Sequence, residues 1–126
     1  QVQDFANQPF VSLSADDPYR RQIDARFAEA GVARQLHLQT HSAVAVCAMV
    51  QQGLGLAIVN PLTALAMAGS GLVVRRLGFS VPFSINALLP LFRTALPEAQ
   101  PLLHCLQAQA GEVTTALQRL LTQPAH

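Results

Sequence analysis

The chain has 126 residues, of which 51% are hydrophobic and 12% are charged. This composition excludes a disordered chain, because enough apolar surface is available to offset the entropy of ordering. The formal net charge of +1 argues against a chain that binds DNA through a basic patch of its own. One domain, or one lobe of a two-lobed protein, fits the length. Because the chain is this apolar for its size, part of its surface is expected to contact another lobe or another subunit.

The first forty residues predict a strand, a helix and a second strand. Residues 9–14 form a short apolar run that predicts a strand. The run Asp16-Asp17-Pro18 suits the start of a helix over 18–30, with an Asp near the N-cap and Pro18 at the first helical position. The charged residues of this helix indicate a solvated or subunit-facing surface. Residues 34–40 alternate, so a strand is expected with Leu36 and Leu38 facing inward and its polar residues outward. The outward residues are Gln35, His37 and Gln39.

The next segments continue the alternation of helices and strands. Ser42 suits the cap of a helix over 43–52, and Gly53 suits its end. Residues 56–59 are continuously apolar, which is typical of a strand buried on both faces of a parallel sheet. A short helix over 61–67 and a strand over 72–76 follow. The order predicts an α/β unit over residues 1–78, with a parallel sheet and right-handed crossovers.

The pattern changes after Gly78. Residues 81–89 read as one extended segment, and residues 97–121 as a long helix with an apolar stripe. A strand and one helix cannot form a core of their own, and isolated helices gain most of their stability from packing. Residues 79–126 are therefore expected to return into a neighbouring lobe.

Two cysteines, Cys47 and Cys105, lie far apart and do not form a disulfide framework. Cys47 stands in an apolar run and is expected to be a small buried hydrophobe. No stretch is long and apolar enough to span a bilayer, so no membrane partner is expected. The first residues are polar and show no signal peptide, which favours a cytoplasmic location.

Three segments carry a family resemblance. They are Phe-Val-Ser-Leu-Ser at 10–14, Gln-Thr-His-Ser-Ala at 39–43, and Val-Gln-Gln-Gly-Leu-Gly-Leu-Ala-Ile-Val-Asn-Pro at 50–61. In order and spacing they resemble the second effector-binding subdomain of LysR-type transcriptional regulators. The sequences of these segments are most similar to the branch of the family that includes regulators of opine and amino-acid catabolism. The resemblance covers nearly the whole chain.

The resemblance implies a fold and a set of partners. The fold would be a periplasmic-binding-protein-like (type 2) α/β lobe with a mostly parallel sheet and flanking helices, plus a C-terminal strand and long helix. Residues 1–78 would be the second lobe, and residues 79–126 the crossover strand and helix that belong to the absent first lobe. The regulator would form a homodimer or homotetramer, with the helix at 18–30 and the strand at 34–40 facing a second subunit. DNA would be bound only through an N-terminal helix-turn-helix that this chain lacks.

Five small polar residues are the candidate ligand contacts. In open α/β sheets, ligands bind beyond the carboxyl ends of the strands, where this chain has Ser14, Thr40, His41, Ser42 and Asn60. The helix that starts at Ser42 offers free amides to an anion, so the effector is expected to be a small anionic or zwitterionic metabolite. Each residue also has a plainer role, as a cap, a turn or a solvated side chain.

Other kinds of chemistry fit less well. His41, Ser42 and Asp16 could be written as a triad, but adjacent His and Ser side chains rarely meet and no Gly-x-Ser-x-Gly elbow is present. His37, His41 and Cys47 lack the spacing of metal ligands, and no cofactor motif is found. We therefore expect no enzyme activity, no metal and no cofactor. Two alternatives stay open, a fragment of a periplasmic solute-binding protein and a small α/β hydrolase or transferase.

Overall fold

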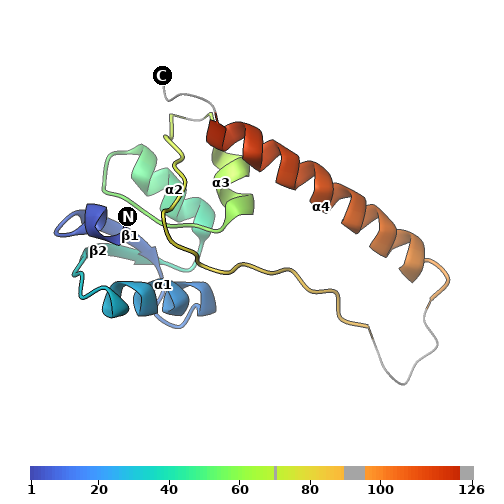
Figure 1. The fold of residues 1–126 in the computed structure, drawn as a ribbon, viewed down its shortest axis with the longest axis horizontal. Coiled ribbons are helices and arrows are strands. Elements are labelled where there is room, and N and C mark those ends of the chain that lie inside the picture. The colour runs from blue at the N-terminus through green and yellow to red at the C-terminus, as the bar shows by residue number, and fades with distance from the viewer. Residues whose placement is uncertain (70, 90–95, 123–126) are drawn as a thin grey trace.

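The computed structural model describes residues 1–69, 71–89 and 96–122. Figure 1 shows the arrangement of its helices and strands. In chain order they are η1 (Val2–Phe5), β1 (Pro9–Leu13), α1 (Pro18–Glu29), β2 (Gln35–Thr40), α2 (Ala43–Gln51), α3 (Pro61–Met67) and α4 (Ala99–Thr122). The predicted α/β class and the order of β1, α1, β2 and α2 are confirmed, with bounds that differ by one or two residues, and the short helix predicted over 61–67 is present as α3.

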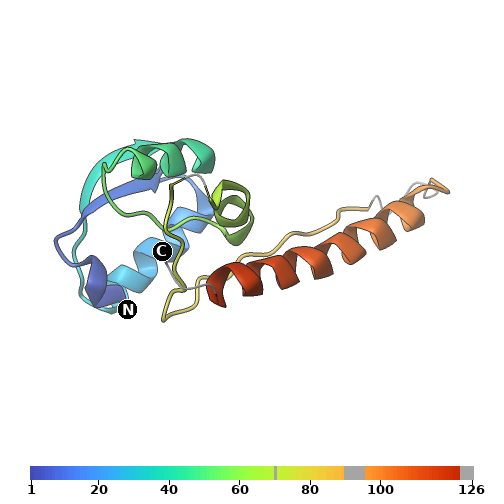
Figure 2. The same cartoon turned by 90° about the horizontal axis from the view of Figure 1, so that it is seen from above.

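Strands β1 and β2 form a parallel pair from Pro9 opposite Gln35 to Leu13 opposite Thr40, with a register shift between Phe10 and Val11. Helices α1 and α2 lie on opposite faces of this pair (Figures 1 and 2). On the other side of β1, Leu56 forms a single parallel bridge with Phe10. The arrangement is a small parallel sheet with a helix on each face, as the alternating sequence predicts.

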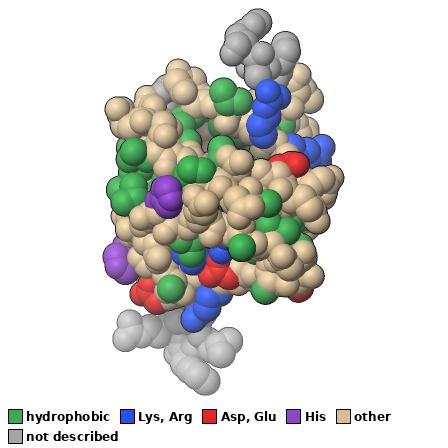
Figure 3. Space-filling view, turned by 90° about the vertical axis from the view of Figure 1, so that its left-hand side faces the viewer, with side chains coloured by type: hydrophobic (Ala, Val, Ile, Leu, Met, Phe, Trp, Pro, Cys, Tyr) green, Lys and Arg blue, Asp and Glu red, His purple; other side chains and the backbone are tan. Residues whose placement is uncertain are grey.

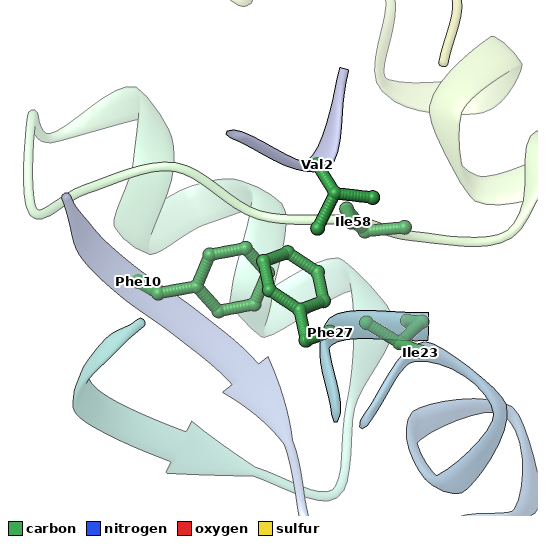
Figure 4. Packing of buried hydrophobic residues seen from close by; sticks show 5 residues of the cluster. All are labelled: Val2, Phe10, Ile23, Phe27 and Ile58. Carbon is green, nitrogen blue, oxygen red and sulfur yellow. The ribbon is translucent and has the colours of Figure 1, made fainter. Parts of the chain in front are cut away.

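The core is divided by β1 into two clusters. On the α1 side, Phe10 contacts Phe27, with ring centroids 6.1 Å apart and planes at 65° (Figure 4). On the α2 side, Val11 and Leu13 pack with Val46. Successive strand residues point to opposite faces, so β1 supplies both clusters. The other buried members of the α1-side cluster are Val2, Ile23 and Ile58.

The segment after α2 departs from the predicted strand at 56–59. Within the described chain only Leu56 pairs with a neighbouring strand, through Val11 N to Leu56 O at 2.9 Å and Leu56 N to Pro9 O at 2.8 Å. The predicted burial on both faces is confirmed in part: Ile58 joins the α1-side cluster, and Ala57 and Val59 contact the α2-side cluster, but Leu56 is 42% exposed. Side-chain burial on both faces thus holds the segment in place without a full ladder of hydrogen bonds.

The predicted strand at 72–76 and the predicted C-terminal strand within 79–89 are wrong. Neither segment has strand structure among the described residues. An apolar run in the sequence indicates a buried, extended segment. A strand also requires a neighbouring backbone segment to pair with. In the described chain neither segment has one.

Strand β2 forms where predicted, but its apolar face is not covered. Leu36 and Leu38 are 39% and 37% exposed, so the prediction that they face a buried interior is wrong. Strand β2 has no neighbour beyond β1 in the two-stranded sheet, and both of these side chains are partly accessible to solvent. The alternation of apolar and polar residues over 34–40 therefore predicted the strand correctly, but it did not predict the exposure of Leu36 and Leu38.

Helix α4 contacts α3 near its own C-terminal end and extends away from the rest of the molecule (Figures 1 and 2). It has no buried residue, and Leu102 at its far end is 60% exposed. The predicted apolar stripe is therefore present and largely uncovered. No helix of the described chain is long and apolar enough to cross a membrane.

Candidate functional site

The ends of β1 and β2 meet at one edge of the sheet. The amide of Ser14 donates to the carbonyl of Thr40 at 3.0 Å, which joins the two strand ends directly. The carbonyl of Ser14 accepts from the amide of Asp17 at 3.0 Å, so the chain turns sharply into α1. Two of the five candidate residues, Ser14 and Thr40, are thus brought together by backbone pairing.

The start of α2 follows at the same edge. The hydroxyl of Ser42 accepts from the amide of Ala45 at 3.3 Å, and the Thr40 hydroxyl accepts from the Ser42 amide at 3.4 Å. Ser42 is therefore the N-cap of α2, as predicted. Within the described residues the amides of Ala43 and Val44 have no hydrogen-bond partner. Free amides at a helix N-terminus, with the positive end of the helix dipole, suit a carboxylate.

His41 stands between Thr40 and Ser42 in the sequence, and its side chain extends into solvent. Its Nδ1 is 4.0 Å from Oδ1 of Asp16, and both side chains are more than three-quarters exposed. Such an exposed pair contributes little to stability. Asp16 had no predicted ligand role, although its position directly beyond β1 was a usable signal. Its exposed carboxylate, next to His41, adds a negative charge at this edge.

Asn60 is placed differently from the other four candidates. Its Oδ1 accepts from the amide of Thr63 at 2.9 Å, which makes it the N-cap of the short helix α3. Val59, directly before it, packs against the α2-side cluster. Among the described contacts none joins the Asn60 side chain to the other candidates. The structure thus groups Ser14, Thr40, His41 and Ser42, with Asn60 further along the chain.

An ion pair between a buried arginine and a partly exposed aspartate supports the end of β1. The side chain of Arg20 is 5% exposed, and its Nε donates to the two carboxylate oxygens of Asp24 at 2.7 and 2.8 Å. Its Nη1 donates to the carbonyl of Leu13 at 2.8 Å, directly before Ser14. Arg20 thereby fixes the C-terminal end of β1 to α1. The interpretation of these charged residues as a solvated surface is wrong for Arg20.

Arg34 is the second buried cation and joins the same carboxylate. It forms a hydrogen-bonded ion pair with Asp24, and its guanidinium carbon lies 4.8 Å from the centre of the Phe10 ring. Burial raises the pKa of Asp24, but hydrogen bonds and charge from Arg20 and Arg34 outweigh it, and the pKa is lowered overall. One carboxylate therefore balances two guanidinium groups beneath the sheet. No pattern in the sequence separated these two arginines from the exposed ones.

The site shows little that would support catalysis or metal binding. In the part of the chain that the structure describes, no three His, Cys, Asp or Glu residues are grouped so as to hold a metal ion. The contacts of Ser42 and His41 described above do not include one between their side chains. On the face shown in Figure 3, basic and acidic side chains lie beside one another rather than in one basic patch.

Comparison with known proteins gives two matches. Residues 1–111 match the family model described as the LysR substrate binding domain. The chain is 44% identical over 119 residues to the transcriptional activator protein LysR of Escherichia coli (strain K12). That alignment covers 94% of this chain and 38% of the relative's length. No solved structure matched the chain.

Proposed function

Because the chain belongs to the LysR substrate binding domain family, we propose that it is the effector-sensing part of a cytoplasmic LysR-type transcriptional regulator. It holds a small anionic or zwitterionic metabolite, and the bound metabolite alters the grip of a separate helix-turn-helix on DNA. A metabolite can do this only by binding one conformation of the regulator more tightly than another. The family is one of transcriptional regulators, so the solute-binding and hydrolase alternatives are not favoured.

One observation carries the proposal. The unpartnered amides of α2, next to the hydroxyls of Thr40 and Ser42, form the anion-binding part of the site. Ser14 lies beside Thr40, and His41 and Asp16 stand at the rim. We assign the effector's carboxylate to these amides and, for a zwitterion, its cationic group to Asp16. Asn60 contributes from the start of α3 if the ligand spans both helices.

The proposed organisation has two lobes in a periplasmic-binding-protein-like arrangement. Residues 1–78 form the second lobe, and residues 79–126 form the crossover segment and helix that pack on the first. Two features support this division. The five candidate residues line none of the described cavities, as expected for one side of a cleft. Helix α4 also leaves its apolar stripe largely uncovered, including Leu102 and Leu106.

The test compares two substitutions of Ser42 that differ by one charge. Ser42→Asn and Ser42→Asp both preserve an N-cap, but only the Asp side chain places a negative charge at the anion site. The ligands are opines, arginine-like amino acids and aromatic acids, measured by calorimetry on the intact regulator. We expect Ser42→Asn to retain binding of the active compound and Ser42→Asp to lose it. Equal binding by the two variants would contradict the assigned site.

The exposed edge of the sheet supports a second role in self-association. Strand β2 has unpaired backbone groups on its outer edge, and its leucines Leu36 and Leu38 are more than a third exposed. We assign this edge and the neighbouring face of α1 to the contact between subunits of a homodimer or homotetramer. Two-fold contacts of this kind are self-complementary.

Sedimentation equilibrium tests the subunit contact. Leu38→Lys should weaken association, because it places an ammonium group in the contact. Leu54→Lys is the matched control, since Leu54 is 45% exposed against 37% for Leu38 but lies outside β2 and α1. A wild-type regulator that stays monomeric, or equal effects of the two substitutions, would rule out β2 as the contact.

A further inference from the structure

The backbone groups of β1 point alternately to its two neighbours. Those of Ser14 point toward β2, because the Ser14 amide donates to a carbonyl of that strand at 3.0 Å. Those of Pro9 and Val11 point the opposite way, toward the segment after α2, and both are hydrogen-bonded to Leu56. Because the alternation has a period of two residues, the carbonyl of Leu13 also points toward the segment after α2.

The carbonyl of Leu13 has an arginine as its partner where a strand would supply an amide. Evenly spaced parallel pairing that starts at Leu56 would bring the amide of Asn60 to this carbonyl. Within residues 56–60, all of which the structure describes, pairing with β1 is confined to Leu56, and Asn60 is the N-cap of α3. The Leu13 carbonyl instead accepts from Nη1 of Arg20 at 2.8 Å. The guanidinium thus satisfies a backbone acceptor that the sheet does not pair.

Arg20 is held in this position from its own helix, α1. Its side chain is 5% exposed, and its Nε donates to both carboxylate oxygens of Asp24. The nitrogens of a guanidinium lie in one rigid plane, so the contact with Asp24 sets the direction in which Nη1 points. Leu13 is followed directly by Ser14, so an immobilised Leu13 carbonyl also holds the start of the turn that carries Ser14.

We propose that Arg20 is a positioning residue for the effector site. It holds Leu13 so that Ser14 stays hydrogen-bonded to Thr40, at the same edge as the free amides of α2. This inference rests on the proposed function, in which Ser14 and Thr40 contact the effector. Arg20 acts through the backbone of Leu13 and does not itself contact the effector.

Arg20→Met and Arg34→Met form a matched pair of variants. Both remove a guanidinium that is paired with Asp24, and the two side chains are 5% and 6% exposed. Arg20→Met also leaves the Leu13 carbonyl without its donor. Arg34→Met removes contacts with aromatic rings as well, so it is a demanding control for a general loss of stability.

Amide hydrogen exchange of the unliganded chain measures the effect at the end of β1. The protection of the Ser14 amide against exchange is divided by that of the Val11 amide in the same variant, because global unfolding exposes both. We expect Arg20→Met to lower this ratio by about tenfold, since an unpaired Leu13 carbonyl loosens the end of the strand. Arg34→Met should keep the ratio within about twofold of wild type. An unchanged ratio in Arg20→Met, or an equal fall in both variants, would overturn the proposal.

A second pair of variants applies if Arg20→Met does not fold. Arg20→Lys and Arg34→Lys both keep a positive charge beside Asp24, but a single ammonium group lacks the rigid plane of the guanidinium. We expect the exchange ratio to fall in Arg20→Lys and to stay at the wild-type value in Arg34→Lys. Equal ratios in the two lysine variants would overturn the proposal.

Effector affinity separates this inference from the proposed function. Calorimetry on the intact regulator uses opines, arginine-like amino acids and aromatic acids. We expect Arg20→Met to weaken binding of the active compound by at least about tenfold, and Arg34→Met by less than about threefold. If Ser42→Asp abolishes binding while the two arginine variants bind equally, the effector site stands and the role of Arg20 is overturned. If Ser42→Asp binds as well as Ser42→Asn, the effector site is wrong, and the exchange ratio alone decides whether Arg20 positions Ser14.

Discussion

The guanidinium carbon of Arg34 lies 4.1 Å from the centre of the Phe27 ring. A guanidinium over an aromatic face is attracted by the ring quadrupole, more strongly where water is excluded. The side chain of Arg34 is only 6% exposed, so this contact is largely desolvated. Arg34 therefore depends on two kinds of partner, the aromatic rings of the α1-side cluster and the carboxylate of Asp24.

Asp24→Asn should reduce the free energy of unfolding by about 1–3 kcal/mol. The substitution leaves the buried cations Arg20 and Arg34 without their counter-ion, a loss that costs more in a fully buried pair. We expect a smaller loss of stability than for a fully buried pair, because Asp24 is itself 38% exposed. Urea denaturation measures the change. Glu29→Gln, which breaks the exposed pair with Arg26, is the control and should cost much less; equal costs would contradict the assignment.

Acid should remove the contribution of Asp24 in a defined direction. Its pKa is lowered on folding from an ordinary value of 3.8, so the stabilisation is fully present above that value. It is lost as the pH falls through the lower folded-state pKa. We expect the stability difference between wild type and Asp24→Asn to be constant near neutral pH and to shrink below about pH 3.8. A difference that stays constant at lower pH would show that Asp24 is not linked to the arginines in this way.

Gly55→Ala should destabilise the chain by about 2–4 kcal/mol. Gly55 has φ +145°, and a Cβ there would lie 2.5 Å from the carbonyl oxygen of Pro9, which accepts from the Leu56 amide. The neighbouring Gly53→Ala is the control. Gly53 also has positive φ but has open space around it, so about 1 kcal/mol is expected. Thermal unfolding that ranks the two substitutions equally would argue against a tight contact at Pro9.

Ser42→Ala should cost about 1 kcal/mol of the free energy of unfolding of the unliganded protein, through loss of the α2 cap. Ser42→Asn should restore that stability. The pair separates the structural role of Ser42 from ligand binding, because capping is measured by unfolding of the unliganded protein. If Ser42→Ala is as stable as wild type, the hydrogen bond to Ala45 does not stabilise the helix start.

Local signals in the sequence predicted the elements more accurately than their surroundings. The run Asp16-Asp17-Pro18, and Ser42 with the apolar run after it, marked the starts of α1 and α2 correctly, and the structure identifies Asp17 as the cap of α1. Cap chemistry acts over three or four residues, so it can be read from the chain alone. The strand at 72–76 was predicted equally clearly and is not formed. A strand depends on a partner elsewhere in space, which an apolar run does not specify.

The same distinction applies to the site. Ser14, Thr40, His41 and Ser42 were predicted from strand ends, and the parallel pairing of β1 with β2 does place them at one edge. Their role in binding stays a prediction, as does the opine and amino-acid branch. The burial of Arg20 and Arg34 was not foreseen, because the sequence does not show which arginines a single aspartate can reach. Asp16 was not named as a candidate, although its position directly beyond β1 was a usable signal.

Helix α4 is long compared with the region where it contacts α3. Its 24 residues span about 36 Å, and it meets α3 near its own C-terminal end. A tilt of about 10° at that contact would move the far end by about 6 Å. Small adjustments of α3, whose first turn begins at Asn60, would therefore be magnified along α4 into displacements larger than an atom's diameter.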